Sequence, residues 1–176
     1  MVLSLTTDQL ISSVSEIKAG ERILLSGTIY TARDAAHQRM AMLIAEGKPL
    51  PFPVKNSVLY YCGPTPPRPG EVIGSCGPTT SSRMDPYTPL MLEQGVKATI
   101  GKGTRSAAVI AALQKYHSLY LVATGGAGAL LSRKVRRAGP VAFEDLGPEA
   151  IFRLEVMDFP LIVAVDSMGN NIFERK

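Results

Sequence analysis

The sequence predicts an α/β fold with a mixed sheet. Apolar, β-branched stretches alternate along the chain with segments of helical periodicity, which is the pattern of α/β domains. The β-rich stretches near Tyr30, Tyr60 and Ile73 favour a sheet that contains both parallel and antiparallel strands. With 176 residues, 45% hydrophobic and 19% charged, the chain is expected to form one domain over residues 1–176, without internal repeats or linkers.

The expected helices have recognisable starts and ends. Thr6-Thr7-Asp8-Gln9 resembles a capping box, and Leu10, Val14 and Ile17 follow it at helical spacing until Gly20 ends the helix. Further helices are expected at residues 34–46, 86–94, 105–115 and from the glycines at 125–128 to about 137, with a helical turn at 148–152.

Two of these helices have an expected cap. Asp85-Pro86 has the form of an N-cap followed by a proline at the first helical position. Thr104 is placed to cap the helix that starts at Arg105.

Strands are expected wherever short apolar runs end at turn formers. They lie at residues 22–30, 57–62, 71–76, 97–100, 118–124 and 161–166, with a further short strand at 141–143. Residues 63–70 form a proline-rich turn, and residues 166–170 are expected to form a hairpin turn. Polar loops that begin at Thr31, Gly77, Gly101 and Gly125 follow four strand ends. Open α/β sheets bind ligands at such carboxyl ends.

The loop Gly77–Asp85 is the best candidate for a binding site. It reads Gly-Pro-Thr-Thr-Ser-Ser-Arg-Met-Asp and joins an expected strand to an expected helix. Backbone N–H groups, hydroxyl donors and a guanidinium fork together suit a carboxylate or a phosphate. Arg83 is the natural fork, with Thr79 or Thr80 as a further donor. The alternative is a hydroxyl-rich turn that satisfies its own backbone.

A second polar group follows the strand that ends at Tyr30. Arg33, Asp34 and His37 lie where strand becomes helix, with Arg33 and His37 one helical turn apart, so they can share a pocket. His37 is expected to titrate near neutral pH and to bind a carboxylate or pass a proton. Alternatively, Asp34 caps the helix while Arg33 and His37 face solvent.

Two glycine-rich segments are weaker candidates. Gly101-Lys102-Gly103 lacks the spacing of a Walker A motif, so nucleotide hydrolysis is unsupported. Its glycines would let Lys102 approach a small anion closely, or would merely form a turn. The segment 125–128 is not a complete dinucleotide-binding fingerprint, and close packing of backbone is the favoured interpretation.

Composition excludes several classes of function. The net charge of +4 is mild, the basic cluster at 133–137 is interpreted as a solvated helix face, and aromatics are only 6% with no Trp, so nucleic-acid binding is not expected. No basic leader begins the sequence and no apolar run approaches the roughly 20 residues of a membrane span, so a cytoplasmic protein without membrane contact is expected.

The cysteine content limits metal chemistry. Cys62 and Cys76 have no Cys-x-x-Cys spacing, and buried free thiols are favoured over a disulfide or a ligand role. An iron–sulfur cluster needs about four thiolates, or three with an open iron site, which this chain alone does not supply. We expect neither a metal site nor a Ser-His-Asp triad. The cations Arg33, Arg83 and Lys102 instead suit a small dicarboxylate.

Three segments together carry a resemblance to a known family. They are Ser26–His37 (SGTIYTARDAAH), Gly77–Asp85 (GPTTSSRMD) and Ile100–Gly103 (IGKG), and the tail Phe159–Asp166 agrees with them. The chain resembles the class I fumarases over nearly its whole length. It is most similar to their β subunit, which equals the carboxy-terminal region of the single-chain enzymes, and is also similar to the small subunit of L-tartrate dehydratase.

The resemblance implies a fold, a reaction and a partner. The fold would be of the swivelling-domain type, with β/β/α layers. The reaction would be the interconversion of (S)-malate with fumarate and water by a hydro-lyase whose [4Fe-4S] cluster is bound by a partner α subunit and not by this chain. The active site would form where the two parts meet, in a hetero-oligomer such as α2β2.

The resemblance also assigns roles to individual residues. Arg33, Arg83 and Lys102 match positions that hold the substrate carboxylates. Thr79 matches a threonine that takes part in proton transfer. Asp34 is expected to orient Arg33 as a member of the catalytic group.

The remaining matches and alternatives complete the expected site. Thr80 and His37 are expected to contribute to substrate binding, with His37 in the site or just behind it. An L-tartrate dehydratase β subunit and a stand-alone carboxylate-binding regulatory module remain the alternatives.

Overall fold

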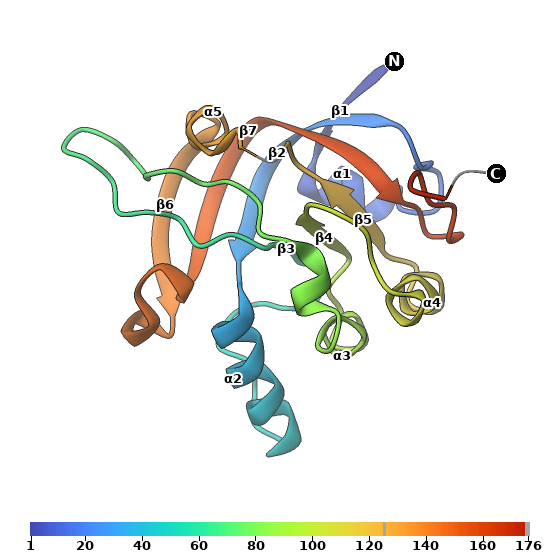
Figure 1. Cartoon of the computed structure of the whole chain (residues 1–176), viewed down its shortest axis with the longest axis horizontal. Coiled ribbons are helices and arrows are strands. Elements are labelled where there is room, and N and C mark those ends of the chain that lie inside the picture. The colour runs from blue at the N-terminus through green and yellow to red at the C-terminus, as the bar shows by residue number, and fades with distance from the viewer. Residues whose placement is uncertain (125, 175–176) are drawn as a thin grey trace.

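A mixed sheet forms the centre of the chain (Figure 1). The computed structural model describes residues 1–124 and 126–174, and within them the sheet has seven strands in the order β1-β2-β3-β4-β5-β7-β6. The strands are β1 (Val2–Thr6), β2 (Arg22–Thr31), β3 (Val58–Tyr60), β4 (Ala98–Gly101), β5 (Leu119–Val122), β6 (Val135–Ala142) and β7 (Ile151–Val165). The predicted α/β class and mixed sheet are confirmed.

The sheet closes on itself. β2, β3, β4 and β5 pair in parallel, and β7 is antiparallel to both β5 and β2, so these strands form a ring with β1 and β6 attached outside it. β2 is bent at an irregularity next to Gly27, whose φ of 126° favours glycine. An added Cβ at Gly27 would lie only 2.6 Å from Thr7 Oγ1. The bend lets β2 pair with both halves of the long strand β7.

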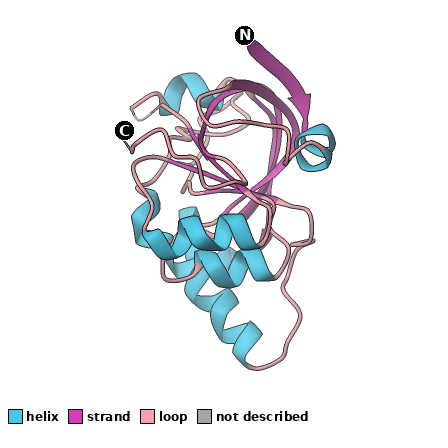
Figure 2. Cartoon of the chain, turned by 90° about the vertical axis from the view of Figure 1, so that its right-hand side faces the viewer, coloured by secondary structure: helices cyan, strands magenta, loops and turns pink. Residues whose placement is uncertain are grey.

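A layer of helices covers one side of the ring, and other helices lie apart from it (Figure 2). The α-helices are α1 (Thr7–Ser12), α2 (Asp34–Ala45), α3 (Thr88–Glu93), α4 (Ala107–Lys115) and α5 (Gly128–Ser132), and 3₁₀ helices are η1 (Ser81–Met84) and η2 (Glu144–Glu149). α2, α3 and α4 gather below the strands in Figures 1 and 2. None of the helices in the described part of the chain has the length and apolar character that a membrane span requires.

Alternation along the strands builds two cores. Val58 and Tyr60 of β3 and Leu121 of β5 face the interior of the ring, where they pack with apolar side chains of β2 and β7. Leu59 and Tyr120 point the other way, into the cluster formed with α2, α3 and α4. Two walls of the ring and one layer of helices therefore give the β/β/α layering that the resemblance implies.

The capping box at the first helix is confirmed, but the helix is shorter than expected. Thr6 Oγ1 accepts from the backbone N–H of Gln9 at 3.2 Å, and Gln9 Oε1 accepts from the N–H of Thr6 at 2.8 Å. α1 ends at Ser12 rather than near Gly20, and turns follow. Val14 and Ile17 still reach the core, so their burial does not require a continuous helix.

The expected strand at 71–76 is wrong. This segment lies against residue 65 through the bonds Thr65 N to Ser75 O and Gly74 N to Thr65 O, at 3.0 and 3.1 Å. The facing arm contains prolines at 64, 66, 67 and 69, which have no N–H to donate. A regular ladder therefore cannot extend along the loop.

The basic cluster does not lie on a helix, which corrects that expectation. α5 ends at Ser132, and β6 begins at Val135. Val135 is buried while Arg136 and Arg137 are exposed, on a strand at the edge of the sheet. Charged side chains are common on edge strands because they discourage pairing with other chains.

The expected helix starts near Asp85 and Thr104 are also wrong. α3 begins at Thr88, and the Asp85 carboxylate instead accepts from Arg105 Nε at 2.7 Å and from Ser106 N at 2.8 Å. Ser106, not Thr104, is the N-cap of α4. A tertiary ion pair thus outcompetes the local cap that the sequence favours.

The helical turn expected at 148–152 is displaced. The 3₁₀ helix η2 covers Glu144–Glu149, and β7 already begins at Ile151. The strand expected at 161–166 is only the C-terminal part of β7, which spans 15 residues.

Candidate functional site

The carboxyl ends of three adjacent parallel strands meet at one edge of the ring. Ala32 N donates to Tyr60 O at 3.0 Å, and Tyr61 N donates to Ile100 O at 2.8 Å, so the ladders continue just past the strands. Arg33 follows β2 and Lys102 follows β4 at this edge. Parallel strands have thus brought side chains from distant parts of the sequence together, as expected for the carboxyl end of such a sheet.

The loop Gly77–Asp85 lies along these strand ends. Thr79 N donates to Tyr61 O at 2.7 Å, and Ser81 N donates to Lys102 O at 3.0 Å. Thr80 forms a parallel bridge with Lys102. These backbone bonds place Thr79, Thr80 and Lys102 in one short ladder, while the 3₁₀ helix η1 carries Arg83 away from it.

Asp34 joins the first two predicted groups. Arg83 Nε donates to Asp34 Oδ1 at 3.1 Å, and Arg83 Nη2 lies 3.1 Å from Asp34 Oδ2. Arg33 Nε is 4.0 Å from the same carboxylate. Asp34 is the first residue of α2 and makes no cap, so its side chain is free for this role. We expected Asp34 to orient Arg33, and in the structure its closer contact is Arg83.

The site contains polar atoms that the chain does not satisfy. Among the described residues, Arg33 Nε is buried and has no hydrogen-bond partner, and the buried Asp34 Oδ2 has only its ion-pair contacts with Arg83 Nη2 and Arg33 Nε. The Arg33 side chain is 27% exposed and that of Arg83 52% exposed, so both guanidinium groups remain accessible. Unsatisfied buried polar atoms next to accessible cations are typical of a site that is completed by another molecule.

Lys102 is a further cation at the same edge. It is half-buried, and in residues 1–124 and 126–174 no carboxylate lies within 4.0 Å of its Nζ. Its charge is therefore available to an anion.

His37 is buried behind Arg33. Its side chain is 0% exposed, Nδ1 lies 2.8 Å from the carbonyl oxygen of Arg33, and its ring packs between Tyr61 and Tyr87. Because Nδ1 donates to that carbonyl, the unpaired Nε2 carries no proton. Burial lowers the pKa of His37 to about 4, so the expectation that it titrates near neutral pH is wrong. His37 supports Arg33 and has no open path to a ligand.

Comparison with known proteins identifies the family. A family model described as "Fumarase C-terminus" matches residues 1–176. The chain belongs to the fumarase C-terminus family.

The relatives of this fumarase C-terminal domain fall into two groups. "Fumarate hydratase 2" of Leishmania major is 38% identical over 96% of the chain, and "Fumarate hydratase class I, anaerobic" of Escherichia coli is 38% identical over 95%. The "Putative L(+)-tartrate dehydratase subunit beta" of Methanocaldococcus jannaschii is 40% identical over 92% of the chain. The chain is therefore homologous to both kinds of hydro-lyase.

The two groups differ in length. The chain spans only 30% of the Leishmania fumarate hydratase and 31% of the anaerobic Escherichia coli enzyme. It spans 86% of the Methanocaldococcus protein and 85% of the "L(+)-tartrate dehydratase subunit beta" of Escherichia coli, which is 34% identical.

Sequence reasoning missed one carboxylate of the site in this fumarase C-terminal domain. Glu149, at the end of η2, accepts from the N–H of Ala35 at 3.4 Å and lies 4.0 Å from Arg33 Nε. It reaches the start of α2 from 114 residues away, and no local motif surrounds it. Only the packing of η2 against α2 reveals it.

Glycines allow the backbone to pack closely around the loop Gly77–Asp85, which we call the anion loop. An added Cβ on Gly101 would overlap Ser81 Oγ, and one on Gly128 would lie 3.0 Å from Gly77 N. Close backbone packing is the favoured interpretation of the segment 125–128. It holds for Gly128 but is wrong for Gly126, which has open space around an added Cβ and a φ of 78° that favours glycine, while Gly125 lies outside the described residues.

The two cysteines lie behind the anion loop. Cys62 and Cys76 are buried free thiols with Sγ atoms 3.1 Å apart, which confirms the favoured interpretation. Hydrogen bonding to Cys76 and burial raise the pKa of the Cys62 thiol. Within residues 1–124 and 126–174, no group of three or more His, Cys, Asp or Glu could hold a metal ion.

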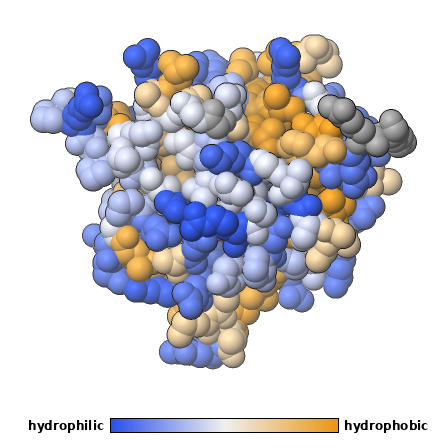
Figure 3. Space-filling model, in the orientation of Figure 1, coloured by the Kyte–Doolittle hydropathy of each residue, from blue (hydrophilic) through white to orange (hydrophobic). Residues whose placement is uncertain are grey.

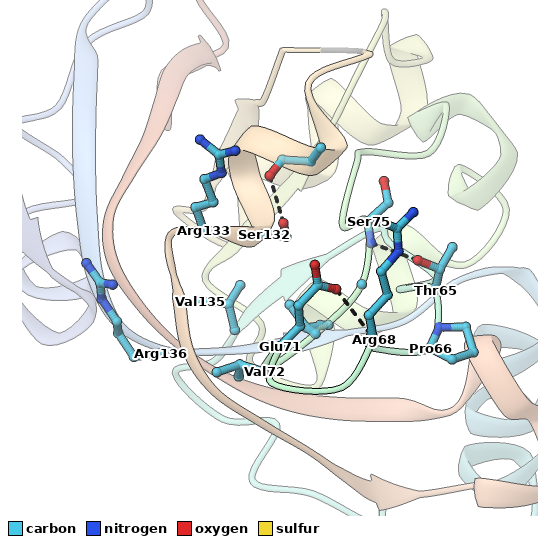
Figure 4. Close-up of a pocket in the computed structure, with 13 residues that line it drawn as sticks. Thr65, Pro66, Arg68, Glu71, Val72, Ser75, Ser132, Arg133, Val135 and Arg136 are labelled. Atoms are coloured by element: carbon cyan, nitrogen blue, oxygen red, sulfur yellow. Dashed lines mark hydrogen bonds between the residues drawn. The ribbon is translucent and has the colours of Figure 1, made fainter.

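A separate pocket lies outside the candidate site (Figure 4). It has a volume of about 550 Å³ and lies between the proline-rich loop and the segment from α5 to β6. Figure 4 shows Arg133 and Arg136 on one side of it and Arg68 on the other. No predicted site residue lines it, so we do not assign it to the same function.

Proposed function

We propose that this chain is the β subunit of an iron–sulfur-dependent hydro-lyase that interconverts (S)-malate with fumarate and water. The observation that carries the proposal is the gathering of Arg33, Arg83 and Lys102 at one edge of the ring, in a member of the fumarase C-terminus family. Three cations along one edge of the ring suit a small dicarboxylate better than a neutral substrate.

In this proposal the arginines bind the substrate carboxylates. The Asp34 carboxylate contacts two nitrogen atoms of Arg83, Nε and Nη2, and these contacts orient the guanidinium group before substrate binds. Arginine has five N–H donors, so donors remain for a substrate carboxylate. Lys102, close to Thr80 in the backbone ladder, would take the second carboxylate.

The same cations would also assist the chemistry. Dehydration of malate removes the hydroxyl group from C2 and a proton from C3, and negative charge develops toward the carboxylate next to C3. Fixed positive charges stabilise such charge because they need no reorganisation during the reaction. Arg33, Arg83 and Lys102 would therefore contribute to both binding and rate.

Thr79 is proposed to take part in the proton transfer at C3. It is half-buried at the strand ends, with its backbone fixed by the bond to Tyr61 O. A threonine hydroxyl is a weak base unless a second group accepts its proton. We propose that this acceptor is an acidic residue of the partner subunit.

The cluster is proposed to belong to the partner. Cys62 and Cys76 contact each other in the core, and two thiols do not complete a cluster that needs about four thiolates. A [4Fe-4S] cluster bound by an α subunit would supply a Lewis acid for the leaving hydroxyl. Two relatives of similar length are named β subunits, which supports a separate partner subunit, and we propose that the two subunits form a hetero-oligomer such as α2β2.

A tartrate dehydratase β subunit is the second candidate. The supporting observation is the 40% identity to the Methanocaldococcus protein over most of both chains. The same cations would bind a dihydroxy dicarboxylate equally well, so this site geometry does not favour one substrate over the other.

Turnover by the reconstituted complex tests the proposal. The chain is produced anaerobically with its cluster-bearing partner, the cluster is reconstituted, and malate and tartrate are compared. We expect fumarate from malate, and turnover of tartrate alone would assign the second candidate. Calorimetry on the isolated chain is expected to show weak or no dicarboxylate binding, and tight binding without a partner would indicate a stand-alone binding module instead.

Substitution of Thr79 tests its proposed role. In Thr79→Ala, kcat should fall by about 100-fold or more with little change in KM, because proton-transfer groups typically contribute ~10²–10⁴-fold. Ser82→Ala, an exposed hydroxyl in the same loop, is the matched control and should leave both constants unchanged. A rise in KM alone would make Thr79 a binding donor.

A further inference from the structure

A buried arginine lies directly behind the candidate site. The Arg105 side chain is 0% exposed, and its Nε donates to Asp85 Oδ1 at 2.7 Å. Its remaining N–H groups face the hydroxyl groups of Tyr61, Thr88 and Thr99. A fully buried charge needs such hydrogen-bond partners to be tolerated. The proposed reaction uses neither Arg105 nor these partners, so their presence behind the site needs another explanation.

Tyr120 connects Arg105 to the short backbone ladder that contains Thr80 and Lys102. The guanidinium carbon of Arg105 is 4.8 Å from the centre of the Tyr120 ring. Tyr120 Oη lies 2.8 Å from the carbonyl oxygen of Gly103 and 2.9 Å from Ser81 Oγ. A phenol has one proton, so Tyr120 donates to Gly103 and accepts from Ser81. Burial raises the pKa of Tyr120 to about 12, so this donor stays protonated at neutral pH.

The two atoms that Tyr120 Oη contacts belong to the two segments that are proposed to bind the substrate carboxylates. Ser81 lies between Thr79 and Arg83, and Gly103 follows Lys102. Ser81 N also donates to Lys102 O, and Gly101 makes room for the Ser81 side chain. The Tyr120 hydroxyl therefore holds the anion loop and the lysine segment at a fixed spacing.

Stability alone does not explain the buried charge. Buried ion pairs contribute little net stability compared with well-packed apolar residues, and their better-supported use is to select one arrangement of the chain. Arg105 and Asp85 also bring together the starts of α3 and α4 and the end of η1, which carries Arg83.

We propose that Arg105 and Tyr120 are positioning residues that set the distance between the carboxylate-binding loop at 79–83 and Lys102. This role rests on the proposed function, in which these two segments bind one dicarboxylate. Neither residue touches substrate. Their effect is to keep the cations at the spacing of two carboxylates, and an error of ~1 Å in such a spacing can cost about 100-fold in rate.

Removal of one hydroxyl group tests the proposal with little disturbance. Tyr120→Phe keeps the ring over Arg105 and deletes only the bonds to Ser81 and Gly103. In the complex with the partner, kcat/KM should fall by about tenfold to 100-fold. Ser118→Ala is the matched control. Ser118 is equally buried and lies just before β5, at the end of that strand remote from the site, and the substitution also removes hydrogen bonds to two backbone carbonyl groups. The two variants should have similar melting temperatures but different activities.

A double-mutant cycle separates positioning from general destabilisation. Ser81→Ala removes the hydroxyl group that is hydrogen-bonded to Tyr120 Oη. The double variant with Tyr120→Phe should therefore lose little more activity than Tyr120→Phe alone. Strictly additive losses, or equal losses in Tyr120→Phe and Ser118→Ala, would overturn the proposal.

Hydrogen exchange in the complex gives a readout that needs no substrate. The amides of Thr79 and Ser81 should exchange faster in Tyr120→Phe than in Ser118→Ala, and unchanged exchange would refute the positioning role. If the wild-type complex turned over neither malate nor tartrate, the proposed function would fail, while this measurement would still decide whether Tyr120 fixes the two segments.

Discussion

Arg83 and Asp34 meet through two guanidinium nitrogens, a contact that a lysine ammonium cannot reproduce. Arg83→Lys keeps the charge but loses the fork, so kcat/KM should fall by about 10- to 100-fold, the equivalent of a charged hydrogen bond worth ~1.5–3 kcal/mol. The melting temperature should change little because Arg83 is 52% exposed. Arg68→Lys, exposed and outside the site, is the control. Wild-type activity in Arg83→Lys would remove Arg83 from the site.

His37 makes stability depend on pH below neutrality. Its pKa is about 4 in the folded chain and near 6.5 when unfolded, because burial disfavours the charged ring. The unfolded state therefore binds the proton more tightly, and stability is lost as pH falls from about 6.5 through 4. The full loss is about 3 kcal/mol.

Urea unfolding between pH 7 and pH 4.5 measures this effect. His37→Gln keeps an N–H donor without a titrating ring and should show a shallower fall in the free energy of unfolding than the wild type. Equal pH slopes in the two proteins would contradict the assignment.

Local sequence predicted the identity of the site residues better than their contacts. Arg33 and Asp34 are predicted from their place after a strand, and Arg83 from the polar composition of its loop. The structure brings all three together, although residues 71–76 before that loop form no strand. The sequence did not show that Asp34 contacts Arg83 more closely than Arg33, or that His37 is buried. Both depend on how α2 packs against the anion loop, which no local pattern encodes.

At the scale of elements, the end of β4 depends on Gly101. An added methyl group would overlap Ser81 Oγ and come within 2.9 Å of the Tyr61 ring. Gly101→Ala should destabilise the chain by ~1–3 kcal/mol, the usual cost of overpacking, and should also lower activity by moving Ser81.

The control for this substitution is Gly139→Ala in β6. No atom lies within 4 Å of the position that an added Cβ would take at Gly139, so its substitution should change the free energy of unfolding by less than about 0.5 kcal/mol. Chemical denaturation of both variants checks the contrast, and equal stability of the two would show that the loop tolerates a side chain at residue 101.

Elements with a strong local signal were predicted well, and elements defined by pairing were not. The capping box of α1 and the apolar run of β2 were both found. β1 was missed, and β7 was predicted only at its buried end, because its first part alternates between buried and exposed positions. Such strands are stabilised by their neighbours in the sheet rather than by their own composition.

At the scale of the molecule, the closed ring shields the two thiols. Cys62 and Cys76 lie within the core cluster inside the ring, and the pKa of Cys62 is raised. Thiol reagents attack the thiolate, so neither cysteine should react at pH 8 in the folded chain, whereas both should react in denaturant. Rapid labelling of the native protein would show that the loop at 63–76 opens readily.

Hydrophobic and hydrophilic residues are unevenly distributed over the surface of the molecule (Figure 3). An apolar patch lies near the N-terminal strand, where Val2, Leu24 and Ile162 line a groove of about 350 Å³ formed by β1, β2, β7 and the end of β5. The predicted site residues do not line this groove. The cations and the apolar groove are thus separate features of the fold.

The sequence by itself determined the class of fold, the family and the residues that carry charge at the strand ends, because these depend on local patterns and short motifs. Only the tertiary structure decided that the sheet closes into a ring, that Asp34 contacts Arg83, and that Arg105 and Tyr120 lie behind the site. The reason is physical: hydrogen bonds and ion pairs between distant segments form when strands pair and helices pack, and their partners are separated by tens of residues that contain no signal of the contact.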